Sequence, residues 1–173
     1  MTTTRRRRQI LLEPAQSQRR TRRLFRREFQ ASLMSDSKWR KLLTLLHESE
    51  LNLPACIVKW IDWPVPVLMA TPSAADLHPP RGFLDSLEFG PFALGSIEWM
   101  EFPDVVPTEP RKRNLLLGPD VPIDDRYHGR CGAQQVDRAI AALVMKGQFP
   151  LERRDTGLRI IGHCHRIAPE RVG

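Results

Sequence analysis

The chain has 173 residues, of which 41% are hydrophobic and 27% are charged, and this composition is compatible with a buried core. No stretch approaches the roughly 18–20 consecutive apolar residues of a membrane-spanning helix, so that class is excluded. The three cysteines are too few, and odd in number, for a disulfide framework. They favour a reducing, cytoplasmic environment.

The positive charge of the chain is concentrated at its beginning. The formal net charge is +7, but residues 1–33 hold ten arginines against two glutamates, which is a net charge of +8. Residues 34–173 carry a net charge of −1. Because the basic character belongs to the first fifth of the chain, it does not by itself indicate that the whole protein binds nucleic acid.

Residues 1–34 are an Arg-rich leader that we expect to be disordered, since its apolar surface is too small to offset the entropy of ordering. No apolar run follows the arginines, so the segment is not a secretory signal. A basic helix over roughly Arg19 to Phe29, bound to an anionic surface, is the functional alternative. A further alternative is that Met34, which is followed by a helix-capping Ser-Asp-Ser, starts the native protein.

Residues 35–166 are expected to form one domain with two amphipathic helices. Ser35 to Ser37 offer N-caps for a first helix over 37–48. A second helix is predicted from Ala133 to Lys146 and ends at Gly147. The apolar residues at helical spacing are Trp39, Leu42, Leu43 and Leu46 in the first helix, and Val136, Ile140, Leu143 and Val144 in the second.

Five strand-like segments are predicted in the rest of the domain. They are residues 55–62, the edge segment 65–70, the alternating segment 96–102, and two segments, 149–153 and 158–165, that bracket the turn Asp155-Thr156-Gly157. Residues 103–132 are predicted to be a long exposed loop without a strong element, and residues 167–173 a loose tail. Helices that flank a run of strands without strict βαβ alternation predict an α+β fold, in which a small antiparallel or mixed sheet carries both helices on one face.

Four residues are weak candidates for a metal site. His163 and His165 lie on one side of a predicted strand, and His128 and Cys131 add two more ligands, but neither pair has the spacing of a known zinc site. Ordinary structural histidines are the preferred interpretation. A nucleophilic Cys131 with one of these histidines as base lacks any acyl-transfer motif, and the common nucleotide-binding and hydrolase motifs are absent. We therefore expect no enzyme activity and no cofactor.

Acidic residues are concentrated between residues 47 and 109. Ten carboxylates stand there against Lys59 and Arg81, a net charge of −8, and aromatic residues are interleaved with them. Carboxylates combined with large flat side chains are typical of a docking surface for a basic protein. A solvated acidic face over an aromatic core is the alternative. The residues that we expect on or near the docking face are Asp85, Glu88, Glu98, Glu101 and Asp104.

Three segments together resemble a family of small bacterial proteins of largely unassigned function. They are the helix start at 37–43, the strand 96–102 with its Ile-Glu-Trp-Met-Glu core, and the terminal strand 157–163. The resemblance covers residues 37–166. Some members of that family resemble immunity proteins against secreted bacterial toxins, including type VI secretion effectors. The resemblance implies a compact cytoplasmic α+β protein that acts by binding, and it transfers no catalytic residue.

The sequence thus predicts an immunity protein that neutralises a cognate toxin, such as a nuclease, by direct occlusion. Nuclease toxins are commonly basic because they bind phosphate, and an acidic inhibitor can imitate that charge. Two alternatives stay open. One is a nucleic-acid-associated protein that uses the leader and the basic cluster Arg111 to Arg113. The other is a small metal-dependent enzyme that uses the four His and Cys candidates. No contact with a membrane is expected.

Overall fold

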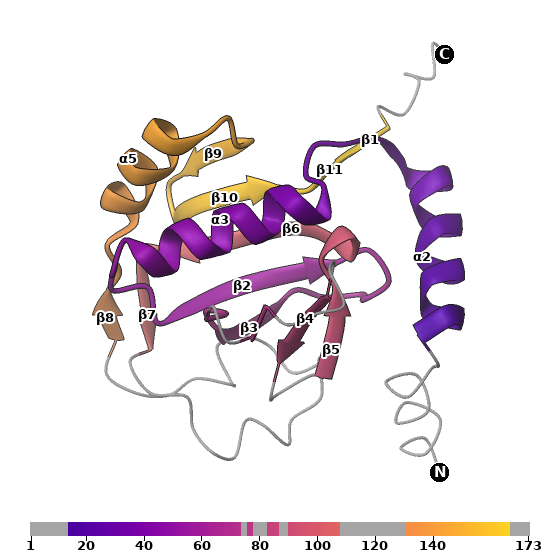
Figure 1. Cartoon of the computed structure of the whole chain (residues 1–173), viewed down its shortest axis with the longest axis horizontal. Helices are drawn as coiled ribbons and strands as arrows, with labels where there is room; N and C mark the ends of the chain where they lie inside the picture. Colours follow the sequence, from indigo (N-terminus) through magenta and orange to yellow (C-terminus); the bar gives the residue numbers. More distant parts are fainter. Residues whose placement is uncertain (1–13, 74–75, 78–82, 87–89, 108–130, 167–173) are drawn as a thin grey trace, which may run out of the picture.

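The computed structural model describes residues 14–73, 76–77, 83–86, 90–107 and 131–166, and Figure 1 shows their arrangement. These residues combine helices with antiparallel strands, so the fold is α+β, as predicted. The elements in chain order are α2 (Pro14–Glu28), β1 (Phe29–Ser32), α3 (Asp36–Glu48), β2 (Ala55–Trp60), β3 (Val67–Ala70), β4 (Phe83–Ser86), β5 (Gly90–Ala93), a short 3₁₀ helix (Leu94–Ser96), β6 (Ile97–Pro103), β7 (Val105–Pro107), β8 (Cys131–Ala133), α5 (Val136–Lys146), β9 (Leu151–Arg154), β10 (Gly157–Ile161) and β11 (His163–His165).

The central element is a five-stranded antiparallel sheet with the strand order β3-β2-β6-β10-β9. α3 contacts α5, and both helices lie on the same face of this sheet (Figure 1). The predicted placement of the two helices is therefore confirmed. The edge position of β3 is confirmed as well, and it follows Pro64 and Pro66, which cannot donate to a sheet.

The hydrophobic core lies between the sheet and the two helices. α3 begins after Ser35, whose side-chain oxygen accepts a hydrogen bond from the backbone N–H of Lys38 at 3.2 Å. The buried stripe of α3 is the one that its spacing predicts, whereas Val144 of α5 is 64% exposed because the buried side of α5 centres on Ala139. The core residues include Trp39, Leu42, Leu43 and Leu46 of α3, Val136, Ala139 and Leu143 of α5, and Val58, Met100, Phe102, Leu158 and Ile160 of the sheet.

The middle strand β6 contains a β-bulge. Trp60 pairs with Ile97, but the preceding Lys59 pairs with Trp99, so Glu98 is an extra residue on β6. Simple alternation predicts that Glu98 points to solvent, and this prediction is wrong because Glu98 is only 8% exposed. The bulge redirects its side chain to the part of β6 that adjoins β11.

Gly162 joins β10 to β11 where the large sheet meets the N-terminal segment. Its N–H donates to the carbonyl oxygen of Glu98 at 2.8 Å, and its own carbonyl oxygen accepts the N–H of Leu33 at 2.8 Å. A Cβ atom at this position would lie 2.1 Å from the carbonyl oxygen of Ile97. The backbones approach so closely here that only glycine fits.

β1 and β11 form a two-stranded ribbon beside the main sheet. Phe29 of β1 is 2% exposed, and its ring lies 4.3 Å from that of His165 and 5.6 Å from that of His163, centroid to centroid. α2 leads directly into this ribbon and stands to one side of the domain in Figure 1. In the described part of the leader, α2 and β1 are formed and Phe29 and Met34 are buried, while the expected disorder of the leader as a whole stays a prediction. Residues 1–13 lie outside the described residues.

The two ends of the predicted 103–132 loop pair with each other. β7 and β8 are antiparallel partners, and this corrects the expectation that the segment has no strong element. Gln134, which is 8% exposed, fixes the pair to the sheet: its Nε2 donates to the carbonyl oxygen of Pro103 at 2.7 Å, and its Oε1 accepts the N–H of Ala55 at 3.2 Å. Residues 108–130, and the predicted tail 167–173, lie outside the described residues.

Candidate functional site

Glu98, one of the predicted toxin-contact residues, is neutralised within the protein. Its carboxylate accepts hydrogen bonds from Lys59 Nζ at 3.0 Å and from His165 Nε2 at 2.8 Å. The Glu98 side chain is 11% exposed, whereas that of His165 is 59% exposed. A histidine beside a carboxylate can orient a proton-transfer group, but among the described residues neither side chain is hydrogen-bonded to a serine, threonine or cysteine. The hydrogen bond joins β6 to β11.

Glu101 lies in a second buried cluster, on the face of the sheet opposite the helices. Arg159, its direct neighbour on β10, donates from Nε at 2.8 Å and from Nη2 at 2.6 Å. Thr156 Oγ1 donates to the other carboxylate oxygen at 3.0 Å. The guanidinium of Arg159 also stacks on Trp99, 3.8 Å from the ring centroid. All the partners of Glu101 are thus supplied internally.

The remaining predicted toxin-contact residues do not complete a free acidic face. Asp104 pairs with Arg153 through two oxygens, each 3.0 Å from a guanidinium nitrogen. Asp85 lies in β4, but its side chain is outside the described part of the structure, as is the whole of Glu88. The expectation of an exposed acidic surface is therefore wrong for Glu98 and Glu101, because the sheet register places Lys59 beside Glu98 and Arg159 beside Glu101. Whether any of the five contacts a toxin stays a prediction.

The four metal-ligand candidates are not brought together in the described residues. His163 and His165 lie in β11, which pairs with β1, whereas Cys131 lies in β8, which pairs with β7. His128 falls outside the described residues. Within the ranges that the structure describes, no group of three or more His, Cys, Asp or Glu side chains is arranged to hold a metal ion.

His163 is a buried histidine. Its Nε2 donates to the carbonyl oxygen of Gly95 at 2.9 Å, and its Nδ1 is buried without a hydrogen-bond partner among the described residues. The rings of Phe25 and Phe29 meet it edge-on, 5.1 and 5.6 Å away between centroids. Burial lowers the pKa of His163 below its usual value of 6.5. The hydrogen bond to Gly95 and the negative charge of Glu98 raise this pKa, but their effect is smaller than that of burial.

This lowered pKa predicts a loss of stability in acid. The unfolded chain binds the His163 proton more tightly than the folded protein, so the stabilising contribution is complete above about pH 6.5 and falls as the pH drops through that value. We expect the free energy of unfolding in urea to be smaller at about pH 5.5 than at about pH 7.5. His163→Gln, which keeps a donor for Gly95, should reduce this difference. An unchanged pH dependence in His163→Gln would assign the effect to other groups.

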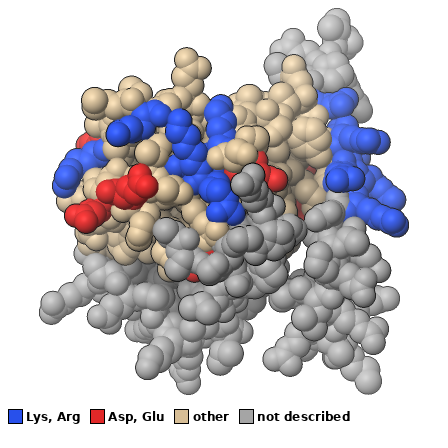
Figure 2. Space-filling view, viewed as in Figure 1, with Lys and Arg blue, Asp and Glu red and all other residues tan. Residues whose placement is uncertain are grey.

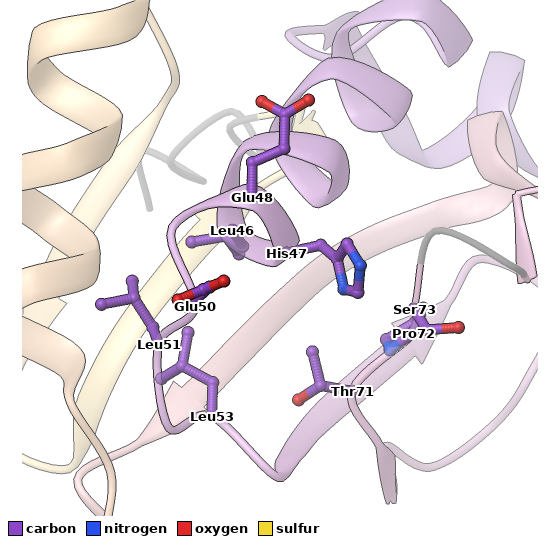
Figure 3. A pocket seen from close by; sticks show the side chains of 9 residues that line it. All are labelled: Leu46, His47, Glu48, Glu50, Leu51, Leu53, Thr71, Pro72 and Ser73. Carbon is purple, nitrogen blue, oxygen red and sulfur yellow. The ribbon is translucent and has the colours of Figure 1, made fainter.

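A hollow of about 560 Å³ lies between the end of α3 and the end of β3 (Figure 3), which is within the usual range of about 300–1,000 Å³ for binding pockets. Its floor contains Leu53 and Thr71, and Figure 3 shows Glu48 at the rim, pointing away from them. The hydroxyl of Thr71 is buried and has no hydrogen-bond partner in the described part of the chain. The lining residues are Leu46, His47, Glu48, Glu50, Leu51, Leu53, Thr71, Pro72 and Ser73.

The hollow favours a cation. Glu48 and Glu50 are both exposed, and neither has an ion-pair partner among the described residues. The C-terminal end of α3 adds the partial negative charge of its last carbonyl groups. Three leucines provide an apolar wall for the alkyl part of a long basic side chain.

Glu50 has an unusual backbone conformation. Among the described residues other than glycine, Glu50 is the one with a positive φ, 49°. Its N–H donates to the carbonyl oxygen of His47 at 3.1 Å. Glycine commonly fills this left-handed position after a helix, and a residue with a Cβ atom is less stable there by about 1 kcal/mol. The glutamate thus reduces stability at a position that lines the hollow.

The sequence does not predict this hollow. Glu48 and Glu50 count among the acidic residues of the segment 47–109, but their sequence positions do not distinguish them from the others. The hollow forms because the pairing of β2 with β3 brings Thr71 back to the end of α3. A long-range contact of this kind leaves no local pattern.

Comparisons of the chain with protein-family models, with curated proteins and with solved structures gave no match. The resemblance to small bacterial immunity proteins therefore stays a prediction that depends on the three quoted segments. In the part of the chain that the structure describes, none of the helices has the length and apolar character needed to cross a membrane.

Proposed function

We propose that this protein is an immunity protein, which binds and neutralises a toxin of the same bacterial cell by direct contact. The resemblance of residues 37–166 to proteins of that kind supports the proposal. The main structural support for the proposal is the acidic hollow at the end of α3, because it offers a site for a basic side chain. The protein needs no cofactor and transforms no substrate in this role, and it acts in the cytoplasm, where the toxin threatens its producer.

The hollow replaces the β6 surface as the proposed contact. Glu98, Glu101 and Asp104 already have internal cationic partners, so breaking those pairs to bind a toxin would leave charges uncompensated. Glu50 has no such partner among the described residues. A lysine or arginine of the toxin can donate to Glu50 while its methylene groups pack on Leu51 and Leu53.

The chemistry of the hollow also indicates the class of toxin. A toxin that acts on nucleic acid carries basic residues around its active site because it must bind phosphate. If Glu50 bound such a basic residue, the nucleic acid could no longer bind there. The opposite charges of the two proteins would also speed their association. A nuclease delivered as a type VI secretion effector fits these requirements.

The test is co-expression with the toxin encoded by the adjacent reading frame. We expect the full chain to restore growth and to co-purify with that toxin. Glu50→Gln should weaken the complex by about tenfold to hundredfold, since a charged hydrogen bond contributes about 1.5–3 kcal/mol. Glu152→Gln, a matched control on exposed β9 and outside the hollow, should change the dissociation constant by less than about threefold.

Glu50→Gly separates binding from stability. It relieves the positive φ, so it should raise the free energy of unfolding by about 1 kcal/mol while it weakens binding as much as Glu50→Gln does. Wild-type affinity in both Glu50 variants would remove the hollow from the interface. Failure of the unaltered chain to restore growth or to form a complex would overturn the immunity proposal itself.

A further inference from the structure

The arginines of α2 lie on one side of the helix. Successive residues turn by about 100°, so all six fall within an arc of roughly 160°. All six are exposed, whereas Thr21, Leu24, Phe25 and Glu28 on the opposite side are partly buried. The members of this arginine face are Arg19, Arg20, Arg22, Arg23, Arg26 and Arg27.

The opposite side of α2 is anchored to the domain. The ring of Phe25 stacks on that of Phe29 with 5.8 Å between centroids and meets His163 edge-on at 5.1 Å. The chain then continues directly into β1 of the ribbon. The arginine face is therefore held at a fixed place, and Figure 2 shows its positive charge along the edge of the molecule where Figure 1 places α2.

We propose that the arginine face binds the phosphate backbone of double-stranded DNA. From Arg19 to Arg27 the helix is about 12 Å long, and a duplex carries about seven phosphate charges over that length. A helix also fits the major groove of B-form DNA, which is about 12 Å wide. Each guanidinium can donate two parallel hydrogen bonds to a phosphate and is more weakly hydrated than an ammonium group.

The number of available arginines limits the expected affinity. Arg27 forms an ion pair with Glu28, and the other five have no acidic partner in the described residues. About four or five phosphate contacts support binding without sequence preference, in the micromolar range at physiological salt. Four further arginines, at 5–8, precede the helix in the sequence but lie outside the described residues.

An anionic membrane is a poorer partner for this helix. An interfacial helix inserts an apolar face between lipid headgroups. The apolar side of α2 offers Leu24 and Phe25, and Phe25 is already packed against Phe29 and His163. Because the exposed side consists of arginines, α2 is attracted mainly to negative charge, and a DNA duplex carries one negative charge per about 1.7 Å of its length.

The test measures binding of the full chain to a labelled DNA duplex by fluorescence anisotropy. We expect the dissociation constant to rise by about 250-fold between 50 and 200 mM salt, a slope of about −4 in log K against log salt. Replacement of Arg19, Arg22, Arg23 and Arg26 by glutamine, which keeps helix propensity, should abolish most binding. The matched control replaces four exposed cations of the domain by glutamine, with the same loss of charge: Lys41, Arg138, Lys146 and Arg154.

The control variant distinguishes DNA binding at the arginine face from a general effect of the positive charge of the protein. A control variant that binds DNA within about fivefold of the wild type supports the arginine face. Equal losses in the two variants, no binding at 50 mM salt, or binding to phosphatidylserine vesicles but not to DNA would overturn the proposal. The inference does not depend on the immunity role, since the hollow and its Glu50 are intact in every variant of this test.

Discussion

Replacing Arg159 with leucine is expected to lower the free energy of unfolding by about 3–5 kcal/mol. Glu101 is 6% exposed in its side chain and depends on Arg159 for two of its hydrogen bonds. Without the guanidinium, a carboxylate stays buried with only Thr156 as donor, and Trp99 loses its stacked cation. Urea unfolding near neutral pH measures the loss directly.

A double-mutant cycle separates the ion pair from packing. Replacing Glu101 and Arg159 together by leucine should recover much of the loss, since an apolar pair of similar volume is often as stable as a buried ion pair. Arg154→Leu, on the exposed part of β9, should stay within about 0.5 kcal/mol of the wild type. Equal stability of Arg159→Leu and Arg154→Leu would show that Glu101 does not depend on its cation.

Gly162→Ala is expected to reduce stability by about 3 kcal/mol, at the upper end of the effects of overpacking. The added Cβ would lie 2.1 Å from the carbonyl oxygen of Ile97 and 3.1 Å from Trp39 in the core. Backbone must move, and the amides of Leu33 and Met34, which bond to the carbonyl oxygen of Gly162, lose their acceptor. Hydrogen exchange at these two amides should accelerate beyond the change that lower global stability causes.

Gly95→Ala is the control for that substitution. Its Cβ would lie 3.0 Å from Oδ1 of Asp36, the end of an exposed side chain that can rotate away. We expect a change within about 0.5 kcal/mol. Slow exchange at Leu33 and Met34 in Gly162→Ala would contradict the close packing of β11 against β6.

Local sequence patterns predicted the elements of the main domain. Helical spacing identified α3 and α5, alternation identified β6, and the turn ending at Gly157 identified the β9–β10 hairpin. In each case the residues that determine the element are neighbours along the chain, so their periodicity is visible without knowledge of the fold.

Charge was harder to predict because it depends on residues distant in sequence. The segment 47–109 has a net charge of −8 when counted along the chain, yet Arg159, Arg153 and His165 enter from beyond it and pair with its carboxylates. The leader shows the same dependence on distant residues, because the aromatic contacts of Phe29 in β1 come from His163 and His165 in β11. Sheet register, rather than composition, determines which charges stay free.

The pairing of β1 with β11 has a consequence for synthesis on the ribosome. Arg166 Nε donates to the carbonyl oxygen of Phe29, 137 residues earlier, at 3.1 Å. β10 is also synthesised after β6, although the two strands are neighbours in the sheet. A nascent chain must therefore expose the unpaired edge of β6 and leave α2 undocked until β10 and β11 have left the ribosome, and chains that stop before these strands are prone to aggregate.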